Sequence, residues 1–180
     1  MNSLYFTIGL PRSGKSTLAK KWLHSELDII NNAFTSEFVS HVELTRVNNV
    51  KRIVVTPDAW RLALGHRYNW YAEPVVFSHV QVAIRALLLD YDVLVDDTNT
   101  SIESITRIFE VDPTATYVRV DTSEVECIQR AIACGQPDLE GVIKRMSHNI
   151  ERLKTNGNFK HNFSVVRFDV INHASRKVVV

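Results

Sequence analysis

The 180 residues predict an α/β domain built around a central parallel sheet, and two patterns support this prediction. Short apolar strands alternate with amphipathic helices along most of the chain. Polar residues follow directly after several of these strands, at the edge where open parallel sheets bind ligands. We therefore expect a single domain over 1–180, and the 45% of hydrophobic residues are enough for a substantial core.

The first half of the chain supplies two of the expected strands. An alternating apolar run at 4–8 predicts the first strand, and apolar residues at helical spacing predict a helix directly after the glycine-rich stretch at 9–16. Residues 24–50 are weakly periodic, so we expect an insertion there with a short helix around 37–45. A surface excursion is favoured for it over an element that contacts substrate. The β-branched run at 52–56 predicts a buried strand.

The second half continues the alternation. Asp58 can cap a helix that ends near Gly65, and a long amphipathic helix at 73–89 carries Pro74 in its first turn. Val-Leu-Val at 93–95 is a short buried strand. The remaining elements are predicted in the order helix 101–109, strand 116–120, a helix capped by Thr122 or Ser123, helix 139–157 and strand 164–170.

The stretch at 9–16 reads G-x-x-x-x-G-K-S, which is typical of a loop that binds the phosphates of a nucleoside triphosphate. Its glycines let the backbone curl so that N–H groups point at the phosphates, and the following helix adds its positive end. Lys15 would reach the β- and γ-phosphates, and the Ser16 hydroxyl would be a ligand of Mg²⁺. We therefore expect ATP and Mg²⁺ to bind here, with ATP contacted by Gly9, Arg12, Ser13, Gly14, Lys15, Ser16 and Thr17.

Asp58 and Arg61 follow the strand at 52–56 and lie one helical turn apart. The carboxylate is placed to accept a proton from a hydroxyl, and the guanidinium is suited to bind a phosphate bidentately. The alternative is that Asp58 is only a helix cap and Arg61 its solvated neighbour. Asp96 and Asp97 follow the strand at 93–95, so their carboxylates are expected at the same sheet edge.

Three blocks in this order resemble the phage polynucleotide 5′-hydroxyl kinase family: G-L-P-R-S-G-K-S-T at 9–17, D-A-W-R at 58–61 and V-D-D-T-N at 95–99. The resemblance continues more weakly through the helices at 124–153. It implies the P-loop kinase fold, with about five parallel strands, the loop strand in the middle, flanking helices and a helical lid at about 122–150.

By this resemblance, Asp58 is the general base and Arg61 binds the phosphate of the acceptor nucleotide. Asp97 matches the aspartate of the acceptor site better than Asp96, which would instead be structural or lie behind the Mg²⁺. Arg130 matches the first arginine of the lid, and with Lys15 it would stabilise the transferred charge. These roles make Lys15, Asp58, Arg61, Asp97 and Arg130 the expected catalytic residues.

The chain departs from the family in its lid. Four residues after Arg130, where the family usually has a second arginine, this chain has Cys134. Arg145, Arg152 or Lys144 would compensate, the lid aligns differently, or catalysis is weaker. Arg130 itself could also be an ordinary surface residue.

A second stretch suggests contact with nucleic acid. In Gly65-His-Arg-Tyr-Asn-Trp-Tyr71, basic and aromatic side chains interleave, as in sites that stack the bases of a single strand. Packing at the base of a loop accounts for the aromatic residues equally well.

These features predict a phosphotransferase that moves the γ-phosphate of ATP to a hydroxyl, foremost the 5′-OH of a nucleic acid or nucleotide. The 21 basic and 20 acidic residues give no overall charge signature of a nucleic-acid binder, which fits a kinase of a small molecule such as a nucleoside, sugar, antibiotic or nucleotide sugar slightly better. A module that binds ATP to regulate a partner is the non-enzymatic alternative. No long apolar stretch is present, so we expect a cytoplasmic protein, in the host cytoplasm if it is phage-encoded, without a membrane partner; oligomeric state is left open.

Overall fold

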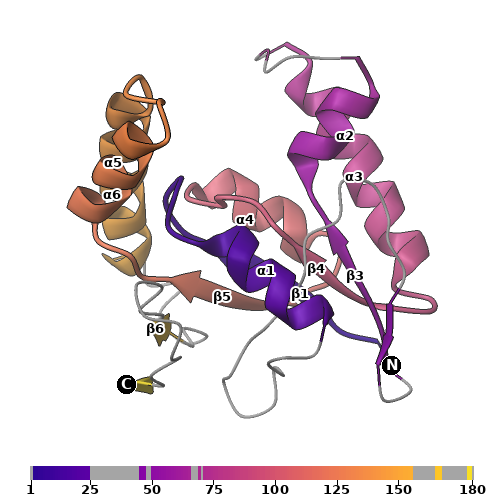
Figure 1. Cartoon of the computed structure of the whole chain (residues 1–180). Helices are drawn as coiled ribbons and strands as arrows, with labels where there is room; N and C mark the ends of the chain where they lie inside the picture. The colour runs from indigo at the N-terminus through magenta and orange to yellow at the C-terminus, as the bar shows by residue number, and fades with distance from the viewer. Residues whose placement is uncertain are drawn as a thin grey trace.

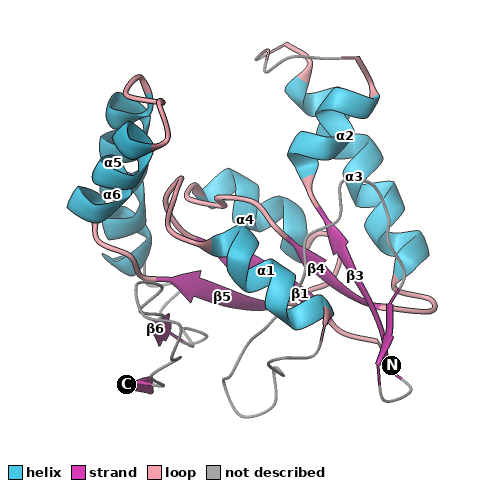
Figure 2. Ribbon diagram, viewed as in Figure 1, coloured by secondary structure: helices cyan, strands magenta, loops and turns pink. Residues whose placement is uncertain are grey.

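The computed structural model describes residues 2–24, 45–47, 50–65, 69, 71–155, 165–167 and 178–179. The strands are β1 (Leu4–Ile8), β2 (Thr45–Val47), β3 (Val50–Val55), β4 (Asp92–Val95), β5 (Thr116–Val120), β6 (Val165–Arg167) and β7 (Val178–Val179). The helices are α1 (Lys15–Leu23), α2 (Pro57–Ala63), α3 (Glu73–Leu87), α4 (Ile102–Phe109), α5 (Glu124–Ala133) and α6 (Leu139–Thr155). Figure 2 shows how they are arranged.

The described strands form one sheet in the order β2-β3-β4-β1-β5-β6-β7. The five inner strands β3, β4, β1, β5 and β6 pair in parallel, so β1 lies in the middle of the sheet as predicted. The edge strands β2 and β7 pair antiparallel with β3 and β6, and neither was predicted. The register places Phe6 beside Val95 on one side and beside Tyr117 on the other.

Strand β2 corrects the predicted insertion at 24–50, because its last part belongs to the sheet. Thr45–Val47 pairs with β3, and this pairing starts β3 at Val50, two residues before the predicted strand. The helix predicted around 37–45 lies outside the described residues except for Thr45, which is in β2.

Helices cover both faces of the sheet. On one face, α1 buries Leu18, Trp22 and neighbouring apolar residues against Val54, Leu94 and Val118. On the other face, α3 and α4 pack their buried aliphatic residues against the strand side chains that point away from α1, such as Phe6. Successive strand residues point to opposite faces, so a sheet covered on both sides needs continuous apolar strands. This is why the predicted strands at 52–56 and 93–95 lack polar alternation.

Helix starts follow the sequence signals with one correction. Ser101 caps α4 in a reciprocal capping box with Ser104, and Ser123 caps α5 by accepting a hydrogen bond from the Glu126 N–H. The N-cap of α2 is Thr56, whereas Asp58 lies within the first turn. The interpretation of Asp58 as a helix cap is therefore wrong, because Pro57 already occupies the first turn before it.

Two helical pairs rise above the sheet at opposite sides, α2 with α3 and α5 with α6 (Figure 1). Between α5 and α6, a small core of Cys127, Ala131, Ile143 and Ile150 also includes Leu10 from the phosphate loop. The two helices predicted as a lid thus contact the phosphate loop directly. Within the described part of the chain, no helix combines the length and apolar character needed to cross a membrane.

Candidate active site

The strand order brings the predicted site residues to one edge of the sheet. β3, β4 and β1 are consecutive neighbours, and each is followed by one of the predicted segments: Asp58 with Arg61, Asp96 with Asp97, and the loop at 9–16. Parallel strands end at the same edge, which places these segments side by side. The charges of Asp96, Asp97 and Asp58 all act on the Lys15 amine, so the three segments converge on that group.

The loop is as tightly curled as its sequence requires. A Cβ on Gly9 would lie 2.9 Å from the Ser13 Oγ and 3.0 Å from the Val120 carbonyl oxygen, so only glycine fits there without a shift. Arg12 has a φ of 65° and Gly14 a φ of 102°, both in the left-handed region. The chain then enters α1 at Lys15 with its first N–H groups directed at the loop.

Lys15 is buried inside this loop. Its Nζ donates a 2.7 Å hydrogen bond to the Leu10 carbonyl, and only 7% of the residue is exposed. Burial lowers the pKa of the amine, and the carboxylates of Asp96 and Asp97 work against that shift. The Ser13 Oγ beside it is buried without a hydrogen-bond partner, which leaves a hydroxyl available to a ligand of the loop.

Asp96 and Asp97 face different parts of the site. Asp96 is buried next to the loop, where burial raises its pKa while Lys15 and the Ser16 hydroxyl lower it. Asp97 accepts a 2.7 Å hydrogen bond from the Thr98 N–H at its Oδ1 and lines a neighbouring cleft. Burial, with repulsion from Asp58 and Asp96, raises the pKa of Asp97 to about 6. The structure therefore separates the two adjacent carboxylates, which sequence alone could not do.

Arg61 is clamped between two carboxylates. Its Nε and Nη2 donate to Glu73 Oε1 and Oε2 at 2.7 and 2.8 Å, and its Nη1 donates to Asp58 Oδ1. Arg61 and Glu73 are each 9% exposed, whereas the Asp58 side chain is mostly exposed. The pKa of Arg61 is raised, first by the hydrogen bonds that its guanidinium donates to Glu73. Sequence reasoning used Glu73 only as a helix start, and nothing in its position signalled this pair across α2 and α3.

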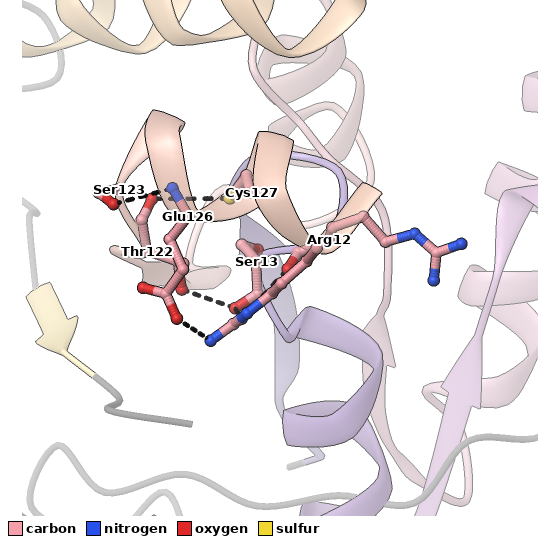
Figure 3. Close-up of polar contacts among 7 residues, drawn as sticks. Arg12, Ser13, Thr122, Ser123, Glu126 and Cys127 are labelled. Carbon is pink, nitrogen blue, oxygen red and sulfur yellow. Dashed lines mark hydrogen bonds and ion pairs between the residues drawn. The ribbon is translucent and has the colours of Figure 1, made fainter. Parts of the chain in front are cut away.

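The phosphate loop contacts Thr122, just before α5, and Arg130 in the last turn of that helix (Figure 3). Thr122 Oγ1 donates a 2.7 Å hydrogen bond to the Ser13 carbonyl. Arg130 Nη1 donates to the carbonyls of Arg12 at 3.2 Å and Ser13 at 3.4 Å, while its Nη2 pairs with Glu126. These contacts place Arg130 against the loop, where a lid arginine was expected.

Five of the seven predicted ATP residues, Arg12 and Gly14 to Thr17, line a pocket of about 440 Å³ together with Arg130 and Cys134. Gly9 and Ser13 do not line it. Cys134 is thus in the pocket, in the place where the family usually has an arginine. None of the three predicted substitutes lines this pocket. Arg145 and Arg152 line other cavities, and Lys144 pairs with Glu140. The second arginine of the pocket is Arg12, whose Nη2 donates to Gln136 Oε1 of the α5–α6 turn.

A larger cleft of about 490 Å³ lies next to this pocket. It is lined by Arg61, Glu73, Pro74, Phe77, residues 97–101, Glu103, Ser104, Arg107, Arg145, Met146 and Asn149. The sequence did not signal Phe77 or Arg107, which lie in α3 and α4. Asn99 in its floor has a φ of 43° and donates from its Nδ2 to the Thr7 carbonyl at 2.9 Å, so it ties the β4 loop to β1.

The interleaved stretch at 65–71 is described only in part. Tyr71 is 88% exposed and so does not pack the base of a loop. The other basic and aromatic residues of the stretch, 66–68 and 70, lie outside the described residues.

No family model and no curated protein matches the sequence. Among solved structures, a chain of the Pnkp1/Rnl/Hen1 RNA repair complex aligns with 99% of this chain at 17% identity and a TM-score of 0.63. A gluconokinase from Sinorhizobium meliloti 1021 aligns with 92% of this chain and 82% of its own, at 13% identity and a TM-score of 0.54.

The APS kinase CysC of Mycobacterium tuberculosis, in complex with AMPPNP and APS, aligns with 72% of this chain and 68% of its own, at 16% identity and a TM-score of 0.53. The present chain spans 48% of the RNA repair chain, about half its length. At these identities the similarity concerns the fold, and the chain has the P-loop kinase fold predicted from its sequence.

Proposed function

We propose that the chain is an ATP- and Mg²⁺-dependent kinase that transfers the γ-phosphate to the 5′-OH of a polynucleotide or nucleotide. The observation that carries the proposal is the convergence, at one sheet edge, of the phosphate loop, Asp97 and the cluster formed by Asp58, Arg61 and Glu73. Phosphoryl transfer requires a phosphate cradle, stabilisation of charge and a base for the acceptor. The phosphate loop and Arg130 line one cavity, Arg61 and Asp97 line the other, and Asp58 pairs with Arg61.

In this proposal Lys15 and Arg130 stabilise the charge on the transferred group. Asp58 accepts the proton of the acceptor hydroxyl, whose oxygen forms a bond to the γ-phosphorus as the bond to the ADP oxygen breaks. Arg61, held on its Nε side by Glu73, binds the acceptor phosphate, and Asp97, which lines the same cleft, binds the acceptor.

The exposed Ser16 hydroxyl and the Asp96 carboxylate behind it are hard oxygen donors, which suit Mg²⁺. The ion would offset the charge of the β- and γ-phosphates when bound. The Asp96 carboxylate would hold Ser16 in place for it.

The identity of the acceptor is the part of the proposal for which there are alternatives. Similarity to a chain of an RNA repair complex supports a nucleic acid. Similarity to a gluconokinase and an APS kinase, together with a net charge of +1, favours a small-molecule hydroxyl as the second candidate. A nucleotide-binding module is less favoured because it has no need of Asp58 and Asp97 beside the loop.

The test is transfer of labelled phosphate from ATP to a panel of acceptors: a 5′-OH oligonucleotide, a nucleoside 3′-phosphate, the free nucleoside and common metabolites. We expect transfer to the first two and a loss of about 10²-fold or more in kcat for Asp58→Asn, because that is the range for general bases. Asp90→Asn, which changes an exposed carboxylate far from the site, should be unaffected.

Each alternative gives a different result in the same panel. Preference for the free nucleoside or a metabolite indicates a small-molecule kinase. Tight ATP binding with no turnover on any acceptor indicates a regulatory module. Full activity of Asp58→Asn would remove the base assignment.

A further inference from the structure

The large cleft extends well beyond the groups that act on the acceptor hydroxyl. Asp97, Arg61 and Glu73 line it, and so do Phe77, Arg107 and the α6 residues Arg145, Met146 and Asn149, which we call the far part of the cleft. Its volume of about 490 Å³ is within the range of about 300–1,000 Å³ in which proteins hold small ligands. The far part of the cleft therefore needs an occupant of its own.

Two arginines, Arg107 and Arg145, lie in this far part of the cleft. Among the described residues, neither Arg107 nor Arg145 forms an ion pair, in contrast to Arg61, which pairs with Asp58 and Glu73. Glu103, one turn before Arg107, influences it only at longer range and is itself exposed to solvent. Arginines in a concave surface without carboxylate partners favour anions, and phosphate above all.

Arg107 is also held in a defined orientation. Its Cζ lies 4.9 Å from the centre of the Phe77 ring, so the guanidinium rests on the aromatic face. This contact uses the face of the guanidinium and leaves its N–H groups, which lie in the plane, free to donate to a phosphate. Phe77 comes one turn after Glu73 in α3, so a single helix carries both the carboxylate that pairs with Arg61 and the ring that supports Arg107.

Arg145 reaches the cleft from the opposite side. It lies in α6, whose buried residues Ile143 and Ile150 pack against α5, while Arg145, Met146 and Asn149 line the cleft. Figure 1 shows α4, which carries Arg107, between α3 on one side and α6 on the other. The two arginines thus offer two separate anion contacts on different elements of one cleft, which Phe77 and Met146 also line.

We propose that this far part of the cleft binds the phosphodiester segment that follows the acceptor nucleotide, through Arg107 and Arg145. The inference rests on the proposed kinase function and narrows its substrate class to a strand of at least two nucleotides. A single phosphate beside the reacting hydroxyl is served by Arg61, which leaves Arg107 and Arg145 for further anionic groups of the substrate. A connected strand carries an anion at each step and places bases or sugars against Phe77 and Met146.

The experiment compares thymidine 3′-phosphate with a single-stranded thymidine hexanucleotide bearing a 5′-OH. For Arg107→Gln and Arg145→Gln, we expect KM for the hexanucleotide to rise about tenfold, as loss of one charge-assisted phosphate contact predicts. KM for thymidine 3′-phosphate should stay within about twofold. Arg85→Gln, which removes the same charge from the exposed side of α3, is the matched control and should change neither value.

Binding is measured separately by the fluorescence anisotropy of a 3′-labelled hexanucleotide without ATP. Each of the two substitutions should lower the slope of log Kd against log salt by about 0.7, the value for one single-strand phosphate contact. Both arginines have solvent access, so the variants should keep the wild-type thermal midpoint. Phe77→Leu should reproduce a weaker form of the Arg107 effect, because it frees that guanidinium from its platform.

Equal KM values for the two acceptors, or a hexanucleotide KM that neither substitution changes, would overturn the inference while leaving the kinase intact. If neither acceptor is phosphorylated, the proposed function fails, and the anisotropy measurement decides the inference on its own. Binding that weakens in both variants then supports the strand-binding cleft, and binding that is absent or unchanged contradicts it.

Discussion

Replacing Asp97 with asparagine should stabilise the folded protein while impairing the proposed reaction. Burial of the carboxylate, with repulsion from Asp58 and Asp96, raises its pKa from 3.8 to about 6. At 1.36 kcal/mol per pH unit, this difference corresponds to about 3 kcal/mol of unfavourable free energy once the group is ionised in the folded state. The asparagine side chain in Asp97→Asn keeps an Oδ1 acceptor for the Thr98 N–H and carries no charge.

The sign of the pH dependence follows from linkage. Below about pH 4 the carboxyl is protonated in both states, so the wild type and Asp97→Asn should have similar free energies of unfolding. Between pH 4 and 6 the unfolded chain loses the proton while the folded protein retains it, and wild-type stability falls relative to the variant. Above pH 6 the difference should level off at about 2 kcal/mol, below the full value because the side chain keeps some contact with water.

Urea unfolding at half-unit intervals from pH 4 to 8 measures this difference. The control is Asp90→Asn, whose side chain is 68% exposed and pairs with Lys51 at 3.7 Å; its unfolding free energy should follow the wild type within about 0.5 kcal/mol. An Asp97→Asn variant that is less stable than the wild type at pH 7, or whose advantage does not change with pH, would refute the reasoning. Its acceptor kcat/KM should fall, because the proposed function uses the Asp97 carboxylate to bind the acceptor.

Three further predictions use other contacts of the site. Glu73→Gln removes the carboxylate that binds the buried Arg61 through two hydrogen bonds. The free energy of unfolding, measured by chemical denaturation, should fall by about 3 kcal/mol, and the KM for the acceptor should rise. An unchanged free energy of unfolding would mean that the pair is not formed in solution. Gly9→Ala should weaken ATP binding, measured by calorimetry, by tenfold or more, because the new Cβ meets the Ser13 Oγ at 2.9 Å; equal affinity would show that the loop can shift. Cys134→Arg adds a positive charge to the phosphate-loop pocket, so kcat should increase severalfold in steady-state kinetics. An unchanged kcat would mean that the reaction needs no second lid arginine.

Much of the fold could be predicted from local pattern. The strand at 116–120 and the helix beginning at Ser101 match the structure because a continuous apolar run and a capping serine act within a few residues. The edge strands β2 and β7 could not be predicted, since a strand of two or three residues has too few side chains for a periodic signal. Asp58 was misplaced as a cap because Thr56 and Pro57 already provide the start of α2.

The candidate site divides in the same way between sequence and tertiary structure. The loop at 9–17 and the carboxylates that follow the strands could be identified from the sequence, because the chemistry of phosphate binding requires certain residue types at a fixed spacing. Only the tertiary structure placed Asp96 against the Ser16 hydroxyl, paired Arg61 with Glu73, and set Arg107 on Phe77. Those contacts join residues on different elements, and their geometry is set by how helices pack on the sheet, which no local pattern encodes.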